Sequence, residues 1–292
     1  MPHPRTEEMI TRMRAGESMR SLARETGIDR STLEHWKAKA DRAEPPTQKN
    51  ARILIYDIET LPNKGYFFDV FSDRGIALEF IEKPKSIVTI AYKFIGDQQP
   101  KVLRANTPYE DADILAKFLP IWESANYGVA HFGRGFDMPF IAARLMANNL
   151  PPLPPLPQID TYQLAKRHFG RSLNSNKLDH LGDVLGLGRK NKTNANLWVG
   201  CAQGKRKALK EMAMYNAQDV TLLEKVFVKL LPHVKSTLNM NLLTDEPIQR
   251  CKSCGSDKLE LKGFELLSST LRHRFQCLAC LAWSTIRPKK RK

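Results

Sequence analysis

The stretch RILIYDIET, residues 52 to 60, carries two acidic side chains, Asp57 and Glu59, inside an apolar, β-branched run. Side chains at positions i and i+2 of a strand leave on the same face, so both carboxylates point into one small volume. Two like charges held this close are costly unless a positive charge lies between them. The stretch therefore predicts a buried strand that binds a divalent cation.

Two later stretches supply further carboxylates. In VAHFGRGFDMPFIAARL, Asp137 follows a Gly-rich loop and begins an amphipathic helix, where an aspartate alone would be interpreted as an N-cap. In KEMAMYNAQDVTLLEKVFVKLL, Tyr215 and Asp219 are spaced i and i+4, so they share one face of a long helix. Taken alone, Tyr215 and Asp219 could simply form a hydrogen bond that stabilises the helix. A set of carboxylates without a nearby Cys or His set suits hard cations such as Mg²⁺ or Mn²⁺.

These residue types suit phosphodiester hydrolysis. The reaction needs an activated water and stabilisation of charge on the attacking and leaving oxygens, which two divalent ions about 3.5 to 4 Å apart supply. We expect two Mg²⁺ or Mn²⁺ ions to be held by the four carboxylates Asp57, Glu59, Asp137 and Asp219. Tyr215 would orient the attacking water, because a tyrosine with an ordinary pKa of about 10 is a poor base at neutral pH.

The elements that must position these residues mix strands and helices. Strand-like runs span 52–58, 86–95 and 127–131, and helix-like runs span 110–124, 138–148, 161–168, 176–186 and 207–231. This mixture predicts an α/β domain. The expected organisation is a helical module at 1–43, a linker at 44–50, the α/β domain at 51–235, a second linker at 236–247 and a cysteine-bearing module at 248–292.

The three ordered motifs resemble those of the DEDD 3′-to-5′ exonucleases of the ribonuclease H-like fold, which include the proofreading domains of DNA polymerases. DIET is similar to the first motif, FDMPF to the second and YNAQD to the third. The tyrosine four residues before the last aspartate is typical of the tyrosine branch. The stretches IDTYQLAKRHF and NKLDHLGDVLGLGRK resemble the segment that joins the second and third motifs. The resemblance covers residues 50 to 235 and implies a ribonuclease H-like core that releases nucleoside 5′-monophosphates from a 3′ end.

One position departs from the family pattern. The second motif usually has Asn five residues before its aspartate, and that position here is Phe132. Seating of the 3′-terminal nucleotide is therefore expected to differ, and His131 beside it is either a substrate contact or a satisfied loop residue. Asp160, in IDTYQL, is expected to cap a helix more than to act as an accessory carboxylate.

Residues 18 to 39, SMRSLARETGIDRSTLEHWKAK, predict two short helices separated by a Gly-containing turn, with Asp29 capping the second. This pattern resembles the helix-turn-helix of transposases and resolvases, whose second helix enters the major groove of DNA. A helical hairpin used for protein docking is the alternative. The expected core of the module is Leu22, Ala23, Ile28, Leu33 and Trp36.

Four of the five cysteines form two C-x-x-C pairs, Cys251 with Cys254 and Cys277 with Cys280. This spacing predicts a four-cysteine zinc ribbon, whose thiolates hold one structural Zn²⁺ and leave no open coordination position. Aromatic side chains could stack on bases, but a minimal core is the expected role of Phe264, Phe275 and Trp283.

The net charge of +15 favours a nucleic-acid partner. No stretch approaches the roughly 20 consecutive apolar residues of a membrane helix, and MPHPRTEEMI lacks a hydrophobic signal core. We therefore expect an intracellular, cytoplasmic protein of a bacterial or phage-infected cell, with no membrane partner. Candidate nucleic-acid contacts are Thr60, Arg30, Ser31, Thr32, Lys37, Arg189, Lys190, Lys192, Arg272 and Arg274.

The leading hypothesis is a metal-dependent 3′-to-5′ exonuclease that acts on DNA in repair, recombination or phage DNA processing. An exoribonuclease, a structure-directed endonuclease and a non-catalytic DNA-binding regulator with an inactive nuclease core remain open alternatives. The helix-turn-helix pattern favours DNA over RNA, because the major groove of A-form RNA is too narrow for a helix. The presence of all four carboxylates argues against the regulator.

Overall fold

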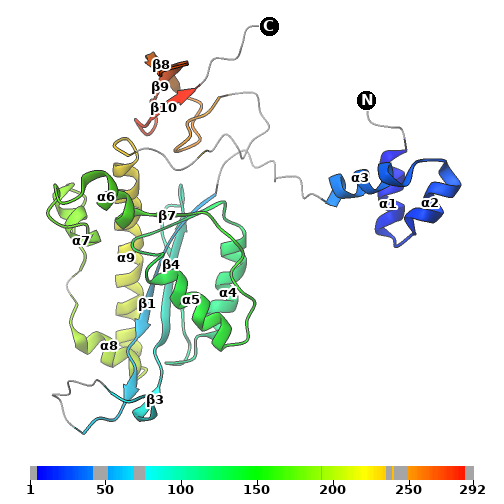
Figure 1. Cartoon of the computed structure of the whole chain (residues 1–292). Coiled ribbons are helices and arrows are strands. Elements are labelled where there is room, and N and C mark those ends of the chain that lie inside the picture. Colours follow the sequence, from blue (N-terminus) through cyan, green and yellow to red (C-terminus); the bar gives the residue numbers. More distant parts are fainter. Residues whose placement is uncertain are drawn as a thin grey trace. The chain divides into compact units, whose positions relative to one another are not determined.

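The computed structural model describes residues 5–41, 52–68, 76–191, 193–234, 239 and 249–286 (Figure 1). It divides into an N-terminal helical unit and a larger unit that contains a central sheet, and each is described by itself. Among the described residues, no helix is both long enough and apolar enough to cross a membrane.

Residues 5–41, the described part of the N-terminal unit, form three helices: α1 (Thr6–Arg14), α2 (Met19–Thr26) and α3 (Arg30–Asp41). Gly27, with φ of +69°, ends α2 in the left-handed region that glycine adopts without strain. As expected, Asp29 caps α3, since its Oδ1 accepts a hydrogen bond from the Ser31 backbone N–H at 2.7 Å.

The core of this unit contains all five side chains that the sequence pattern predicts. Leu22 and Leu33 are fully buried, and Ala23, Ile28 and Trp36 pack against them. The first helix adds two more buried side chains, Met9 and Met13. A three-helix unit of this kind is compatible with both DNA reading and protein docking, so its role stays a prediction.

The central sheet of the larger unit has five strands in the order β5-β4-β1-β6-β7. β1 pairs antiparallel with β4 and parallel with β6, and the β4–β5 pair is antiparallel while the β6–β7 pair is parallel. The bounds of these strands are β1 Ile53–Leu61, β4 Ser86–Phe94, β5 Lys101–Arg104, β6 Tyr127–Ala130 and β7 Gln158–Asp160. A small hairpin of β2 (Lys64–Gly65) and β3 (Ile81–Lys83), with the short helix η1 (Leu78–Phe80), lies between β1 and β4 in sequence.

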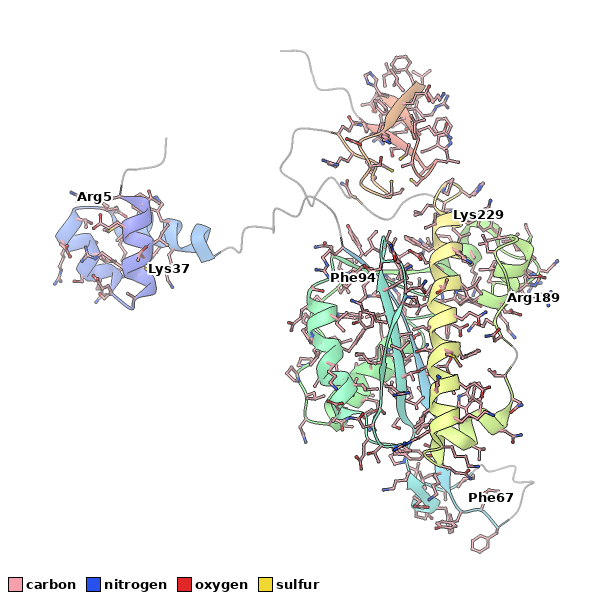
Figure 2. All side chains as sticks on the ribbon, turned by 180° about the vertical axis from the view of Figure 1, so that it is seen from behind. Arg5, Lys37, Phe67, Phe94, Arg189 and Lys229 are labelled. Atoms are coloured by element: carbon pink, nitrogen blue, oxygen red, sulfur yellow. The ribbon has the colours of Figure 1, made fainter. Side chains whose placement is uncertain are left out.

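Helices flank the sheet (Figure 1). Their bounds are α4 Ala112–Glu123, α5 Asp137–Ala147, α6 Thr161–Phe169, α7 Leu178–Val184, α8 Ala195–Ala202 and α9 Arg206–Leu230. The longest of them, α9, packs against β1 and β4, and α7 and α8 pack against α9 (Figure 2).

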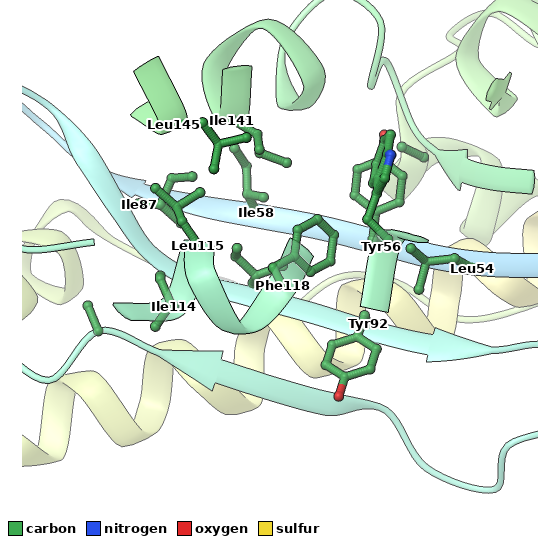
Figure 3. Packing of buried hydrophobic residues seen from close by; sticks show 14 residues of the cluster. Leu54, Tyr56, Ile58, Ile87, Tyr92, Ile114, Leu115, Phe118, Ile141 and Leu145 are labelled. Carbon is green, nitrogen blue, oxygen red and sulfur yellow. The ribbon is translucent and has the colours of Figure 1, made fainter. Parts of the chain in front are cut away.

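Alternation along β1 separates the apolar core from the acidic side chains. Leu54, Tyr56 and Ile58 are buried in one cluster with side chains of α4 and α5, as Figure 3 shows. Asp57 and Glu59 leave on the other face of the strand, toward α9. The period of two residues therefore gives one strand both a packed face and an acidic face.

The sequence pattern predicted the long elements well. The runs expected at 52–58, 86–95, 110–124, 138–148 and 207–231 correspond to β1, β4, α4, α5 and α9. The pattern missed the short strands β2, β3, β5 and β7, the short helix η1 and helix α8. The mixed α/β fold class is confirmed.

The C-terminal described segment forms a three-stranded sheet in the order β10-β9-β8. Its strands are β8 Leu259–Leu266, β9 Leu271–Cys277 and β10 Trp283–Ile286. The buried hydrophobic cluster consists of Cys251, Cys277 and Ala282, packed with Cys254, Leu259 and Cys280. The expectation of an aromatic core is wrong here, because Phe264 and Trp283 are 53% and 46% exposed and Phe275 is only partly buried. The cysteines themselves take the central position.

Candidate active site

Three carboxylates meet between β1 and α9. One carboxylate oxygen each from Asp57, Glu59 and Asp219 lie within 4.8 Å of one another. Asp57 and Glu59 come from the acidic face of β1, where the register against β4 shifts between Glu59 and Thr60. Irregularities of this kind bend a strand and are frequent beside active sites. Asp219 comes from α9 and is 1% exposed.

Asp137 lies beside this acidic triad of Asp57, Glu59 and Asp219 but is not one of its members. It is the first residue of α5, and its Oδ1 accepts a hydrogen bond from the backbone N–H of Ile58 at 3.1 Å. Its side chain is therefore tied to β1 and does not act as an N-cap of α5. After burial, the charge of Asp137 is the next cause that raises the pKa of Asp57.

Burial makes the acidic side chains costly to ionise. Desolvation, followed by the charges of Asp137 and Glu59, raises the pKa of Asp57 well above its ordinary value. Burial raises the pKa of Glu59 to about 7, with Asp219 contributing, and burial also raises the pKa of Asp137 to about 7. A cation at this position would relieve the repulsion and hold the carboxylates ionised at neutral pH.

Two polar side chains contact the acidic triad. The Lys190 ammonium group donates a hydrogen bond to Asp219 Oδ2 at 2.7 Å, and Asn216 Nδ2 donates one to Asp57 Oδ2 at 2.6 Å. Asn216 is fully buried on α9, three residues before Asp219. Sequence reasoning missed Asn216, although an amide within the YNAQD motif of a long helix was a usable signal. Lys190 was a candidate nucleic-acid contact, and in the structure its ammonium group is bonded to a carboxylate.

Tyr215 lies one turn before Asp219 on α9 and is partly buried. Its ring contacts Trp198 at a centroid distance of 6.3 Å, and the Lys190 Nζ lies 5.7 Å from the ring centroid. Burial and then the charge of Asp219 raise the pKa of Tyr215 to about 12. Its hydroxyl therefore keeps its proton at neutral pH, which fits an orienting role and not that of a base.

These residues fit a hard divalent cation. The donor set consists of carboxylate oxygens, which Mg²⁺ and Mn²⁺ prefer. Asp219 Oδ1 is buried and accepts no hydrogen bond from the described residues. The neighbouring Asp219 Oδ2 already binds a positive group, the ammonium of Lys190. The acidic triad is therefore built to hold positive charge.

A pocket of about 430 Å³ lies beside Lys190. Phe132 and Tyr162 form one side of it, with ring centroids 5.3 Å apart in an edge-on arrangement. Phe132 is 45% exposed and has φ of +63°, a left-handed conformation that is uncommon for a phenylalanine. The described residues that line it are His131, Phe132, Tyr162, Lys177, Leu178, Asp179 and Lys190.

Asp160 stabilises the backbone behind this pocket. Its Oδ1 accepts hydrogen bonds from the Gln163 backbone N–H at 3.2 Å, which caps α6, and from the Phe132 backbone N–H at 3.0 Å. The expected capping role is therefore confirmed, and the same carboxylate also holds the strained Phe132 backbone. His131 Nδ1 lies 2.9 Å from Thr161 Oγ1, and burial lowers the pKa of His131 to about 4. The other ring nitrogen, His131 Nε2, is buried and has no hydrogen-bond partner among the described residues, so the ring is only half satisfied and its role stays a prediction.

The other candidate contacts are dispersed. Thr60 lines a separate hollow next to α8, and Arg189 is exposed and paired with Asp183 (Figure 2). Lys192 lies outside the described residues.

In the helical unit, Arg30, Ser31, Thr32 and Lys37 all lie on α3. Arg30 is paired with Glu34 at 2.8 Å. In the C-terminal sheet, Arg272 and Arg274 lie on β9, with the Arg274 guanidinium 5.4 Å from the ring centroid of Trp283. Contacts of these residues with nucleic acid stay predictions.

The four cysteines of the C-terminal module form a second candidate metal centre. Their sulfur atoms lie within 4.8 Å of one another, with Cys251 and Cys280 3.7 Å apart and Cys254 and Cys277 also 3.7 Å apart. Four converging thiols suit a tetrahedral Zn²⁺ site. The cluster could bind metal in the way that the two C-x-x-C pairs predict.

Comparison with known proteins identifies the family. Residues 78–231 match the model of the family RNase_H_2, described as RNase_H superfamily. The match covers more than half of the 292 residues, and the chain therefore belongs to the RNase_H superfamily. The matched span includes Asp137, Tyr215 and Asp219 and begins after Asp57 and Glu59. Membership supports a nuclease with a nucleic-acid substrate.

A solved structure of the family B DNA polymerase from the hyperthermophilic archaeon Pyrobaculum calidifontis is also similar, with 18% sequence identity and a TM-score of 0.45. The similarity covers 62% of this chain and 25% of the polymerase chain. No curated protein matches the chain.

Proposed function

We propose that this protein is a metal-dependent 3′-to-5′ exonuclease that removes nucleoside 5′-monophosphates from DNA. The observation that carries the proposal is the convergence of Asp57, Glu59 and Asp219 within 4.8 Å, with Asp137 tied to the same strand. Two segments far apart in sequence, β1 and α9, bury acidic side chains against each other at this point. Membership in the RNase_H superfamily supports the same reaction class.

The proposed metal ligands are Asp57, Glu59, Asp137 and Asp219. When bound, two Mg²⁺ or Mn²⁺ ions would supply an activated water and stabilise charge on the attacking and leaving oxygens. Asn216 orients Asp57 by its hydrogen bond to Oδ2. Tyr215, with a raised pKa, donates its hydroxyl hydrogen to position the attacking water and does not remove a proton.

We place the terminal nucleotide in the pocket that Phe132 and Tyr162 line. Two exposed or partly exposed rings offer stacking surface to a base, and such stacking contributes about 1–3 kcal/mol per base. Lys177 and Lys190 at the same pocket offer positive charge to a phosphate. Phe132 thus takes the position that the resembling family gives to Asn, and stacking would replace the amide contact.

The terminal modules are proposed to bind DNA. Helix α3 carries polar and basic side chains on a small, buried core, which is typical of a helix that reads a major groove. The four-cysteine module would hold one structural Zn²⁺ and present Arg274 and Trp283 to nucleic acid. DNA in preference to RNA is the proposed substrate on the strength of α3.

The test is a cleavage assay on matched DNA and RNA strands, labelled at the 5′ end or internally, with Mg²⁺, with Mn²⁺ and with EDTA. The Asp57→Asn variant removes one proposed ligand with little change in shape. Asp113→Asn is the matched control, because Asp113 is an exposed carboxylate of α4 paired with Lys117, away from the acidic triad.

A metal-dependent ladder that shortens from the 3′ end of DNA, absent in Asp57→Asn and present in Asp113→Asn, is the expected result. A ladder mainly on RNA would identify a ribonuclease, and discrete internal cuts would identify an endonuclease. Tight DNA binding without any cleavage would contradict an enzymatic function and favour the regulator.

A further inference from the structure

Lys190 reaches the acidic triad from a loop that follows α7. Its backbone N–H donates a hydrogen bond to Asp179 Oδ1 at 2.8 Å, which fixes the start of the side chain. Gly188, with φ of +108°, lies two residues earlier and allows the chain to reverse there. The ammonium group then bonds Asp219 Oδ2 at 2.7 Å. The main chain of Lys190 is anchored, while its four-carbon stem can rotate.

The position of this ammonium group is unusual in two respects. The ammonium group binds an oxygen of Asp219, which is a member of the acidic triad. It therefore occupies one of the carboxylates that a metal ion in the triad would use as a ligand. Its side chain is also 28% exposed and lines the pocket of about 430 Å³ beside Phe132 and Tyr162. A single side chain therefore borders both the carboxylates and the space proposed for the nucleotide.

We propose that Lys190 exchanges partners during the working cycle. It binds Asp219 when no divalent ion is present, leaves Asp219 when an ion binds the acidic triad, and then binds a phosphate group of the substrate in the adjoining pocket. This inference rests on the proposed function, because it requires the triad to bind a divalent ion. The inference goes further in one respect: the Lys190 ammonium group competes with the divalent ion for Asp219 and so lowers the affinity of the triad for that ion.

Electrostatics supports the exchange. A divalent ion bound to Asp219 would lie within a few ångströms of the ammonium group, and two positive charges that close repel each other strongly in a buried site. Asp219 is 1% exposed, so water screens this repulsion poorly. The side chain can leave toward the pocket, where a phosphate anion would replace the lost carboxylate. Lysine suits this role, since its compact charge on a flexible stem changes partners without a fixed bidentate geometry.

The first test measures Mn²⁺ binding by isothermal titration calorimetry on the full-length, zinc-loaded chain. Lys190→Met removes the competing charge and keeps an unbranched stem. Lys177→Met is the matched control, because Lys177 lines the same pocket and is exposed. We expect Lys190→Met to bind Mn²⁺ about 10-fold more tightly than the wild type, since the ion no longer displaces a charged hydrogen bond. Lys177→Met should bind Mn²⁺ with nearly wild-type affinity.

Unchanged or weaker Mn²⁺ binding by Lys190→Met would overturn the exchange, because Lys190 would then be a fixed support of Asp219. An equal gain in Lys177→Met would also overturn it, since the effect would come from net charge alone. If neither the wild type nor the variants bind Mn²⁺ outside the zinc module, the proposed function itself fails. The two failures are thus distinguishable.

The second test follows Lys190 itself. Lysine acetylation by a water-soluble acetylating reagent, read by peptide mass spectrometry, reports whether an ammonium group is engaged. We expect slow labelling of Lys190 in EDTA, faster labelling with Mn²⁺, and renewed protection when thymidine 5′-monophosphate is added to the Mn²⁺ form. Lys101, which is exposed on β5, is the internal reference in the same molecule. Labelling of Lys190 that does not respond to Mn²⁺ would refute the exchange.

Discussion

The α4–α5 side and the α9 side of the central sheet each bury acidic side chains, and the two sides treat them differently. On the first side, Asp111 is fully buried and accepts hydrogen bonds from Arg144 Nε at 2.7 Å and Nη2 at 2.9 Å. It also accepts bonds from Asn148 Nδ2 at 2.8 Å and from the Ile87 backbone N–H at 2.9 Å. Although burial alone would raise it, the pKa of Asp111 is lowered because these donors outweigh desolvation.

On the α9 side, three carboxylates share far fewer donors. Lys190 makes a single hydrogen bond to Asp219, Asn216 makes one to Asp57, and one oxygen of Asp219 has no partner among the described residues. The pKa values of Asp57, Glu59 and Asp219 are all raised, chiefly by burial. A buried carboxylate with its full set of donors has its charge satisfied within the fold, whereas a group of buried carboxylates short of donors is a candidate site for a cation.

The four-cysteine module extends this comparison and gives the largest expected effect. Its core consists of the cysteines and a few apolar neighbours, so removing the metal removes the centre of the fold. Zinc binding supplies on the order of 10 kcal/mol to modules of this kind. We expect one Zn²⁺ per chain by colorimetric release, and rapid proteolysis within residues 249–286 after chelation.

The variant Cys277→Ser should lose that zinc, whereas Cys201→Ala should retain it because Cys201 is buried in the cluster of α8 and α9. If the zinc-free protein resists proteolysis to the same extent as the zinc-bound protein, the fold of this module does not depend on a metal ion.

The next effect concerns the acidic triad. Asp57→Asn should reduce the rate of DNA cleavage at least about 10³-fold, since a lost metal ligand forfeits several kcal/mol of transition-state stabilisation. The same substitution should raise the Tm in EDTA, because it replaces a buried carboxylate whose charged form is disfavoured by burial and by the charges of Asp137 and Glu59. Activity and stability are measured on the same preparations by single-turnover cleavage and thermal unfolding. A Tm of Asp57→Asn below that of the wild type would mean that the fold already satisfies the charge of Asp57. The proposed difference between Asp57 and Asp111 would then be wrong.

Asp111→Ala should do the opposite of Asp57→Asn: it should lower the stability and leave the cleavage rate nearly unchanged. It leaves the Arg144 guanidinium buried without its partner, and breaking such a buried pair costs about 3–5 kcal/mol of unfolding free energy. Urea denaturation measures this loss, and the cleavage rate of the remaining folded protein should be close to that of the wild type. A stable but inactive Asp111→Ala protein would show that this cluster takes part in the reaction.

The sequence predicted the residues of the acidic triad but not the side chains that contact them. Asp57 and Glu59 follow from the period of a strand, and Tyr215 and Asp219 from the period of a helix, so their faces were predictable from local spacing. The bond from Asn216 to Asp57 joins residues 159 positions apart, and no local pattern contains such a pairing. The contact between Lys190 and Asp219 was equally unpredictable, because it depends on how a glycine-containing loop folds back onto α9.

The fold shows the same division. The helices α4, α5 and α9 have apolar patterns long enough to be detected, and they were predicted close to their observed positions. The strands β5 and β7 contain only four and three residues, so pairing with a neighbouring strand and not an intrinsic pattern defines them. The aromatic residues of the C-terminal sheet were assigned to a core because hydrophobicity alone does not reveal that the cysteines occupy it.

The smallest expected effect is a pH dependence at Asp111, which tests the claim that its charge is satisfied. Its pKa is lowered from the ordinary value of 3.8, so its contribution to stability is fully present above that value and is lost as pH falls through the folded-state pKa. Asp111→Asn cannot titrate. The gap in unfolding free energy between wild type and Asp111→Asn should therefore stay constant from about pH 7 to pH 5 and narrow below about pH 4.

Urea denaturation at a series of pH values measures this gap in unfolding free energy. A gap that widens as pH falls would mean that the pKa of Asp111 is raised, as it is for the acidic triad. Burial would then dominate on both sides of the sheet, and the number of hydrogen-bond donors would no longer separate a structural carboxylate from a metal ligand.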